Sequence, residues 1–221
     1  MDKYIQLDAT DKVLVWTLRI IRILLVVSAV LALITLHWME IFVSLVVLAM
    51  TYIADLVQRW YGVKIPLEIE VYMVVLIYAS IFLGELHDFY GIFWWWDSVM
   101  HFTAAIVFGF IGFLIMYTIY HRHKLEASAS LIALFAFCFS MTIGAMWEVF
   151  EFIMDQSFDL TMQPSGFDTM VDLILNAIGA AITSTVGYFY IKREETGVFR
   201  RLVHKFMRDN PQLAKTVARK N

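Results

Sequence analysis

The nonapeptide at residues 147–155, "WEVFEFIMD", brings carboxylates into an otherwise apolar stretch of the chain. Glu148, Glu151 and Asp155 stand at positions i, i+3 and i+7, which share one face of an α-helix. A carboxylate held on such a face can act as a general base or ligate a metal ion. The spacing therefore predicts an acidic site on one helix face, with Glu148 and Glu151 as its candidate catalytic residues.

Two further stretches carry acids, a histidine and an amide at helical spacing. Asp97 and His101 stand at i, i+4, and Asp168, Asp172 and Asn176 stand at i, i+4, i+8. An imidazole nitrogen with carboxylate oxygens suits Zn²⁺, Mn²⁺ or Fe²⁺, whereas oxygens alone suit Mg²⁺ or Ca²⁺. The predicted cofactor is therefore a divalent metal ion. Its candidate ligands are His101, Asp97, Glu148, Glu151, Asp172 and Asp168, and the secondary members of the site are Glu85, Asn176 and Asp155.

The elements that position these residues belong to a very apolar chain. Of its 221 residues, 61% are apolar and only 17% are charged, so a soluble domain could not bury the apolar surface. Six apolar runs reach the roughly 20 residues that a helix needs to cross a bilayer. The predicted fold class is an all-α polytopic membrane protein, with a bundle of six transmembrane helices in one domain. The predicted spans are residues 13–36, 38–56, 67–86, 98–120, 127–152 and 170–191, between an N-terminal segment of 1–12 and a tail of 192–221.

The basic residues all fall on one side of this six-helix arrangement. The 17 Lys and Arg residues occupy the N-terminal end, the second and fourth loops and the segment from Lys192 onward, whereas loops one, three and five contain none. By the positive-inside rule, both termini are then cytoplasmic. The sequence thus predicts a multi-pass protein of the plasma membrane, with the lipid bilayer as its partner.

The tail begins with "VFRRLVHKFMRDN", residues 198–210, in which apolar residues occupy one helical face and basic residues the other. This pattern is typical of an amphipathic helix on an anionic cytoplasmic leaflet. A solvated basic tail is the alternative. Neither interpretation indicates nucleic-acid binding.

The polar residues of the third to sixth runs meet near one depth in the membrane. With a rise of 1.5 Å per residue, Glu85, His101 and Glu148 each lie roughly 27–32 Å from the cytoplasmic end of their helix. An ionised side chain at the bilayer centre costs about 2.5–3.5 kcal/mol and usually faces the interior of the bundle. Because no Lys or Arg stands on that side, protons or a cation must neutralise the acids.

Simpler roles remain open for several of these residues. Asp97 and Asp168 could be helix N-caps, which accept backbone N–H bonds, and Asp155 could be a solvated loop acid. Asn176 could form an interhelical hydrogen bond, and His101 could be a satisfied core histidine. These roles leave the remaining acids of the fifth and sixth runs unexplained.

The sixth run also holds small side chains at helical spacing. Small side chains let two helix backbones approach closely inside a membrane. We therefore expect this run to pack tightly against its neighbours. The residues concerned are Gly179, Ala180, Ala181, Thr183, Ser184 and Gly187.

The motifs "WDSVMHF", "GAMWEVFEF" and "GFDTMVDLILNAIGA" resemble those of the YjdF-type family of uncharacterised bacterial inner-membrane proteins, over most of the chain. More distantly, the chain resembles the VanZ-like family, whose acid, Asp and Asn match Glu148, Asp172 and Asn176. Glu151 stands where that family has Gln, and the segment around Gly166 has no Arg. The resemblance implies a bacterial inner-membrane location and a membrane-embedded polar site, and it implies no particular reaction.

Three functions follow from these patterns. The first is a metal-dependent hydrolase or transferase that acts on a lipid-linked substrate, with Glu148 or Glu151 as general base. The second is a non-catalytic role, in which a structural metal or a protonated polar network joins the helices. The third is a cation or proton transporter, although the cytoplasmic halves of the last three runs hold few of the polar residues that a pathway needs.

Overall fold

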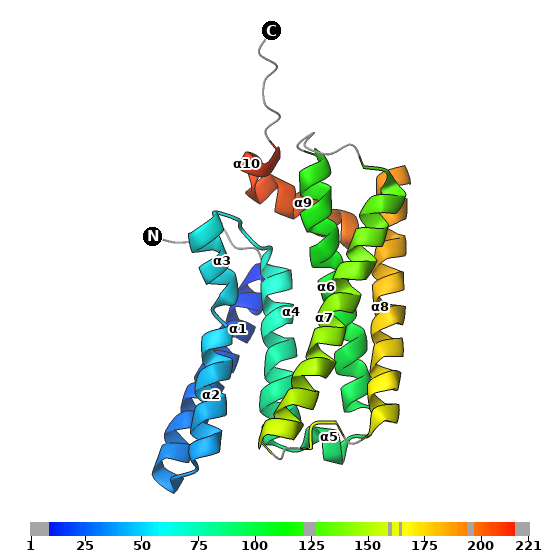
Figure 1. Ribbon diagram of the computed structural model, residues 1–221. Helices are drawn as coiled ribbons and strands as arrows, with labels where there is room; N and C mark the ends of the chain where they lie inside the picture. Colours follow the sequence, from blue (N-terminus) through cyan, green and yellow to red (C-terminus); the bar gives the residue numbers. More distant parts are fainter. Residues whose placement is uncertain (1–8, 122–126, 159–160, 164, 194–196, 215–221) are drawn as a thin grey trace. The chain divides into compact units, whose positions relative to one another are not determined.

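The computed structural model describes residues 9–121, 127–158, 161–163, 165–193 and 197–214 (Figure 1). Within these ranges every regular element is a helix, and six helices are long and apolar enough to cross a membrane. The predicted all-α, six-helix membrane fold is thereby confirmed. The contacts within the chain gather into two compact units, one ending at Trp94 and one beginning at Trp95.

The N-terminal unit packs its helices around a small apolar core. α1 lies against α2 and α4, and α2 also contacts the π-helical segment η1. The buried core residues come from α1, α2, α4 and η1, and they are Leu18, Ile21, Leu25, Val47, Val71, Val74 and Phe82. The elements are α1 (Ala9–Thr35), α2 (Trp38–Met50), α3 (Ile53–Tyr61), α4 (Leu67–Ile77), η1 (Tyr78–Leu86) and α5 (Phe89–Ile92).

The second predicted span is broken at Thr51, where α2 ends and α3 follows. Arg22 of α1 donates from Nη2 to the Thr51 carbonyl oxygen at 2.7 Å and from Nε to Thr51 Oγ1 at 3.1 Å. Its guanidinium also lies over the Tyr52 ring, 4.0 Å from the centroid, and 3.8 Å from Asp55. A cation inside an apolar helix is thus held by polar partners at the break, as membrane burial requires.

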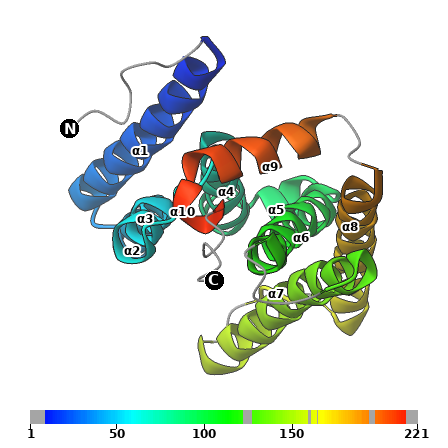
Figure 2. The same cartoon turned by 90° about the horizontal axis from the view of Figure 1, so that it is seen from above.

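The C-terminal unit consists of three long helices and two short ones. α6, α7 and α8 lie side by side, and each contacts the other two (Figures 1 and 2). At the end where α7 finishes and α8 begins, all three extend past their predicted spans. Their bounds are α6 (Trp96–His121), α7 (Ala129–Phe158), α8 (Gly166–Arg193), α9 (Val198–Asp209) and α10 (Pro211–Ala214).

Small side chains bring α6 and α8 together. A Cβ at Gly179 would lie 2.6 Å from the Phe102 carbonyl oxygen, and one at Gly187 would lie 2.6 Å from the Phe113 ring. Backbone cannot move aside for such an atom, so Gly179 is required for this approach. The predicted close packing of the small residues is confirmed for those that are buried, whereas Ala181 is exposed. The buried members are Gly179, Ala180, Thr183, Ser184 and Gly187.

The expected C-terminal amphipathic helix is present as α9, which begins near the end of α8 and contacts that helix (Figure 2). The Phe199 ring contacts those of Phe110, Phe113 and Tyr190, at centroid distances of 4.9, 4.9 and 5.7 Å. Val203 is also buried. Much of the apolar face therefore packs on protein, where the sequence pattern indicated lipid.

Candidate functional site

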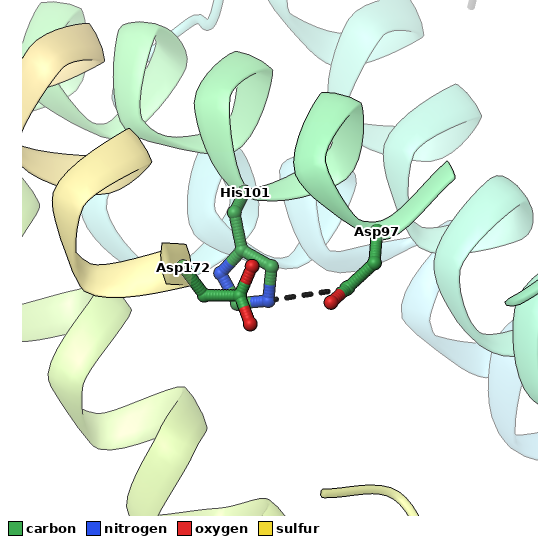
Figure 3. A group of neighbouring side chains, drawn as sticks. All are labelled: Asp97, His101 and Asp172. Atoms are coloured by element: carbon green, nitrogen blue, oxygen red, sulfur yellow. Dashed lines mark ion pairs between the residues drawn. The ribbon is translucent and has the colours of Figure 1, made fainter. Parts of the chain in front are cut away.

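His101 is the centre of a polar cluster at one end of the C-terminal unit. It projects from the first turns of α6 and is 6% exposed. Its Nε2 lies 3.3 Å from Asp97 Oδ1, one turn earlier on α6, and 3.5 Å from Glu148 Oε1 of α7 (Figure 3 shows the Asp97 pair). One imidazole nitrogen thus faces carboxylates from two helices.

Two overlapping groups of ligand atoms share this imidazole. Asp97, His101 and Asp172 each offer one atom, and these atoms lie within 4.8 Å of one another; Figure 3 shows the Asp172 carboxylate beside the ring. His101, Glu148 and Glu151 form the second group under the same distance limit. We call these five residues the acidic site, and each of them was predicted from helical spacing.

The other imidazole nitrogen is occupied by Asn176 of α8. Asn176 Nδ2 and His101 Nδ1 are 3.3 Å apart, and both side chains are buried. A metal ion on Nε2 needs the proton on Nδ1, which must then donate to an acceptor. Rotation of the Asn176 amide by half a turn places its oxygen there, and the two amide orientations have the same shape. Asn176 can therefore hold the imidazole of His101 in either state.

Gly144 of α7 makes room for this amide. A Cβ at Gly144 would lie 2.4 Å from Asn176 Nδ2 and 2.7 Å from its Cγ. The missing side chain on α7 thus lets Asn176 extend between the helices and reach His101. A glycine inside a helix is otherwise unfavourable, by roughly 1 kcal/mol relative to alanine.

Glu148 is the most constrained carboxylate of the acidic site. Its Oε2 accepts a hydrogen bond from Gln163 Nε2 at 3.1 Å, and the same amide donates to the Glu148 carbonyl oxygen at 3.0 Å. Its Oε1 is buried and, within the described part of the chain, accepts no hydrogen bond. A buried oxygen that accepts no hydrogen bond costs about 1–3 kcal/mol, and the ion pair with His101 Nε2 at 3.5 Å offsets this cost only if the imidazole is protonated.

Gln163 belongs to the connection between α7 and α8, and no pattern in the sequence predicted it as a site residue. Asp155, at the end of α7, accepts the backbone N–H groups of Met162 and Gln163 at 2.7 and 2.9 Å. Asp155 therefore holds the connection that delivers Gln163 to Glu148, and it lies outside the two groups of ligand atoms found among the described residues. Its predicted place as a secondary member thus becomes a supporting role.

Glu151 is held by a neighbour one turn away. Its Oε1 accepts a hydrogen bond from Trp147 Nε1 at 2.8 Å, and its side chain is buried. The i, i+4 spacing of Trp147 and Glu151 was visible in the sequence, but Trp147 was not recognised as a partner. The indole orients the carboxylate toward His101, which belongs to the same group of ligand atoms.

The two acids that could be N-caps lie inside their helices. Ser165 occupies the cap position of α8, and its Oγ accepts the Asp168 backbone N–H at 3.2 Å. Asp168 is partly exposed, one turn outward from Asp172, and it is absent from the two described groups of ligand atoms. Asp97 lies in the first turn of α6, where it pairs with His101.

Glu85 is an exposed residue of η1 and belongs to the N-terminal unit. Its place in the acidic site stays a prediction.

Within α6, α7 and α8, His101 is the one basic side chain at the acidic site. α6 contains no Lys or Arg, α7 contains none, and α8 contains none before Lys192. Three buried carboxylates and the partly exposed Asp97 therefore face a single imidazole. Burial of like charges is unfavourable unless protons or a cation balance them. The nitrogen and oxygen donors fit a borderline divalent ion such as Zn²⁺, Mn²⁺ or Fe²⁺.

An all-helical fold with six apolar helices and a buried polar cluster defines a multi-pass membrane protein. More narrowly, the chain belongs to the family described as "Predicted membrane protein (DUF2238)", whose model matches residues 16–193. This range contains the whole acidic site, and the resemblance to the YjdF-type family is thereby confirmed. The VanZ-like resemblance stays a prediction.

A curated relative from Thermotoga maritima, named "Uncharacterized protein", is 29% identical over 130 residues. The match covers 57% of this chain and 64% of the relative, so it spans less than two thirds of that protein. No solved structure matches the chain.

Proposed function

We propose that the acidic site binds one divalent metal ion, and that the protein uses it as a hydrolase or transferase on a lipid-linked substrate. The observation that carries the proposal is Glu148 Oε1, which is buried, lacks a hydrogen-bond partner within the described part of the chain and lies 3.5 Å from His101 Nε2. An ion between these atoms would satisfy both.

The donor set supports a borderline ion more than a hard one. One imidazole nitrogen and several carboxylate oxygens suit Zn²⁺, Mn²⁺ or Fe²⁺, while Mg²⁺ and Ca²⁺ would take the oxygens alone. His101 and Glu148 are the ligands best supported by geometry, with Asp97 and Asp172 completing the set from α6 and α8. Asn176 acts behind His101 as an outer-shell partner.

A bound divalent ion supplies a Lewis acid and activates water. Glu151 is the best candidate for the general base, because Trp147 holds one of its oxygens at 2.8 Å. Its carboxylate also belongs to the same group of ligand atoms as His101 and Glu148. These residues lie near the ends of apolar helices, where the membrane meets water. A substrate with a lipid anchor would bring its polar group to this level.

The direct test is elemental analysis of the purified full chain after dialysis against each candidate ion. We expect about one metal ion per chain in the wild type, and below about one fifth of that in Glu148→Gln and His101→Ala, because each removes a ligand. Glu40→Gln, a matched change on α2, should retain the metal. Equal metal content in the three variants would disprove the proposal.

The alternative is a protonated network, and the distances of 3.3 and 3.5 Å from His101 Nε2 to Asp97 and Glu148 favour it. An imidazolium between two carboxylates has this geometry without any metal. In that case no candidate ion would bind the wild type, and the same variants would lower only the thermal stability. Activity assays with lipid-linked esters and phosphates become informative once metal binding is established.

A further inference from the structure

The opposite end of the C-terminal unit contains a pocket between α6, α8 and α9. Its volume is about 560 Å³, which lies in the range of small-molecule sites. Tyrosines line it from the two long helices, and basic residues line it from α9. We call it the basic pocket, and its polar lining residues are Tyr117, Tyr120, Tyr190, Arg200, His204 and Arg208.

The basic residues of the pocket share one face of α9. Arg200, His204 and Arg208 stand at i, i+4 and i+8, so their side chains project in one direction over two helical turns. Arg200 Nε donates to His204 Nε2 at 3.4 Å, and Arg208 Nε pairs with Asp209 Oδ1 at 3.0 Å. Of the described residues that line the pocket, none is acidic.

This combination of donors fits a phosphate group. A guanidinium presents a planar set of N–H donors that matches phosphate oxygens, and tyrosine hydroxyls add neutral donors. Hydrogen bonds from a charged donor to a phosphate are about twice as strong as neutral ones. A divalent cation would find no carboxylate among the described lining residues, so the pocket selects for an anion.

The pocket is built before any ligand arrives. Phe199 anchors the start of α9 in a group of aromatic rings that includes Phe113 and Tyr190. Val203, in the middle of the helix, is 1% exposed and also lines the pocket. Since α9 is already packed against the long helices, a ligand would not have to order it, and this lowers the cost of binding.

The position of the pocket indicates the source of the phosphate. Tyr120 and Ile191 lie near the ends of α6 and α8, which are long and apolar enough to cross a membrane. Tyrosines at such helix ends lie at the level of lipid headgroups. The distribution of Lys and Arg predicts that this end is cytoplasmic, where anionic lipids concentrate and basic pockets between helices bind their headgroups.

We propose that the basic pocket binds the phosphate headgroup of an anionic membrane lipid, with Arg200 as its principal contact and the tyrosine hydroxyls beside it. The binding is separate from the acidic site and does not depend on a metal ion there.

The test uses the purified full chain in detergent micelles, titrated with phosphatidylglycerol or phosphatidylcholine and followed by native mass spectrometry. We expect phosphatidylglycerol to bind about tenfold more tightly. Arg200→Gln should weaken its binding about tenfold, because a charged hydrogen bond is lost. Arg201→Gln, an exposed neighbour on α9 that does not line the pocket, should change the affinity less than about threefold.

Three outcomes would overturn the proposal. If Arg200→Gln and Arg201→Gln weaken phosphatidylglycerol binding equally, the lipid is attracted by the general charge of the surface and not by the pocket. If phosphatidylglycerol and phosphatidylcholine bind with equal affinity, the pocket does not distinguish the charge of the headgroup. Displacement of the lipid by millimolar inorganic phosphate would assign the pocket to free phosphate. If Arg200→Gln fails to fold, Tyr117→Phe decides, because it removes one hydroxyl from the pocket and should weaken phosphatidylglycerol binding about threefold.

Discussion

The acidic site and the basic pocket lie at opposite ends of the same helices, α6 and α8, and they treat charge in opposite ways. At the acidic site, His101, Glu148 and Glu151 are each at most 6% exposed, and they face one another. At the basic pocket, His204 and Arg208 are exposed along one face of α9. The side chains of the acidic site are shielded from solvent, so their charges must balance one another. The basic side chains at the pocket are exposed, so an external ligand could reach them.

This contrast has an energetic consequence for mutation. Removing one partner from a buried charged cluster leaves the others uncompensated, which costs several kcal/mol. Removing an exposed charge usually changes stability by less than about 0.5 kcal/mol. Substitutions at the acidic site should therefore lower both the stability of the fold and the proposed metal binding. Substitutions at the basic pocket should lower only the proposed lipid binding.

The largest expected effect comes from the two histidines compared directly. His101→Ala removes the imidazole that faces the carboxylates of the acidic site, either as a cation or as a metal ligand, and should cost about 3–5 kcal/mol of stability. His204→Ala should cost below about 0.5 kcal/mol. Unfolding of both variants in detergent, followed by far-UV circular dichroism, measures the difference. Similar stabilities for the two variants would remove the distinction between the ends.

The helix contact that both ends share gives the next effect. Gly179→Ala brings a Cβ to 2.6 Å from the Phe102 carbonyl oxygen, and overpacking of this kind costs roughly 1–3 kcal/mol. Gly166→Ala is the matched control, because a Cβ there meets nothing within 4 Å. Thermal unfolding should separate the two variants, and an unchanged Gly179→Ala protein would show that α6 and α8 are not closely packed at this point.

The Gly144→Ala substitution tests the acidic site without removing any of its candidate metal ligands. Gly144→Ala pushes a methyl group into the Asn176 amide, which lies 2.4 Å from the ideal Cβ position. Loss of an outer-shell partner lowers metal affinity about 10–100-fold. Competition with a chelator measures the affinity, and lipid binding at the basic pocket should be unchanged. Equal metal affinity in this variant would leave Asn176 with a purely structural role.

The smallest expected effect concerns the connection between α7 and α8. Gln163→Ala removes the hydrogen bonds to Glu148 at 3.0 and 3.1 Å, and each such bond contributes about 0.5–1.5 kcal/mol. Metal affinity should fall a few-fold, with the helix content unchanged by circular dichroism. A loss as large as that of Glu148→Gln would instead make Gln163 indispensable to the site.

Residues on one helix were the predictable part of the acidic site. Asp97 with His101, and Asp172 with Asn176, share helix faces through the period of 3.6 residues, which is legible in the sequence. Apolar run length and the distribution of basic residues similarly predicted six long helices and the amphipathic α9. Helical periodicity and apolar run length depend only on residues that are close together in the sequence, so one sequence is enough to detect them.

Contacts between segments were not predictable in the same way. Gln163 comes from a connection without periodicity, and Gly144 matters only because Asn176 of another helix faces it. At the break after α2, the Thr51 carbonyl oxygen accepts a hydrogen bond from Arg22, almost thirty positions earlier. The start of α8 was predicted too late, because polar residues such as Asp168 continue the helix beyond its apolar part.

The pairing of Arg22 with Thr51 also bears on how the chain enters a membrane. Arg22 lies within the first apolar helix, while its partners Thr51, Tyr52 and Asp55 follow in the second. An unpaired arginine at this depth costs about 2.5–3.5 kcal/mol on insertion scales. Contact with the second helix removes this cost from the first, so we expect the two helices to insert more readily as a helical hairpin than one after the other.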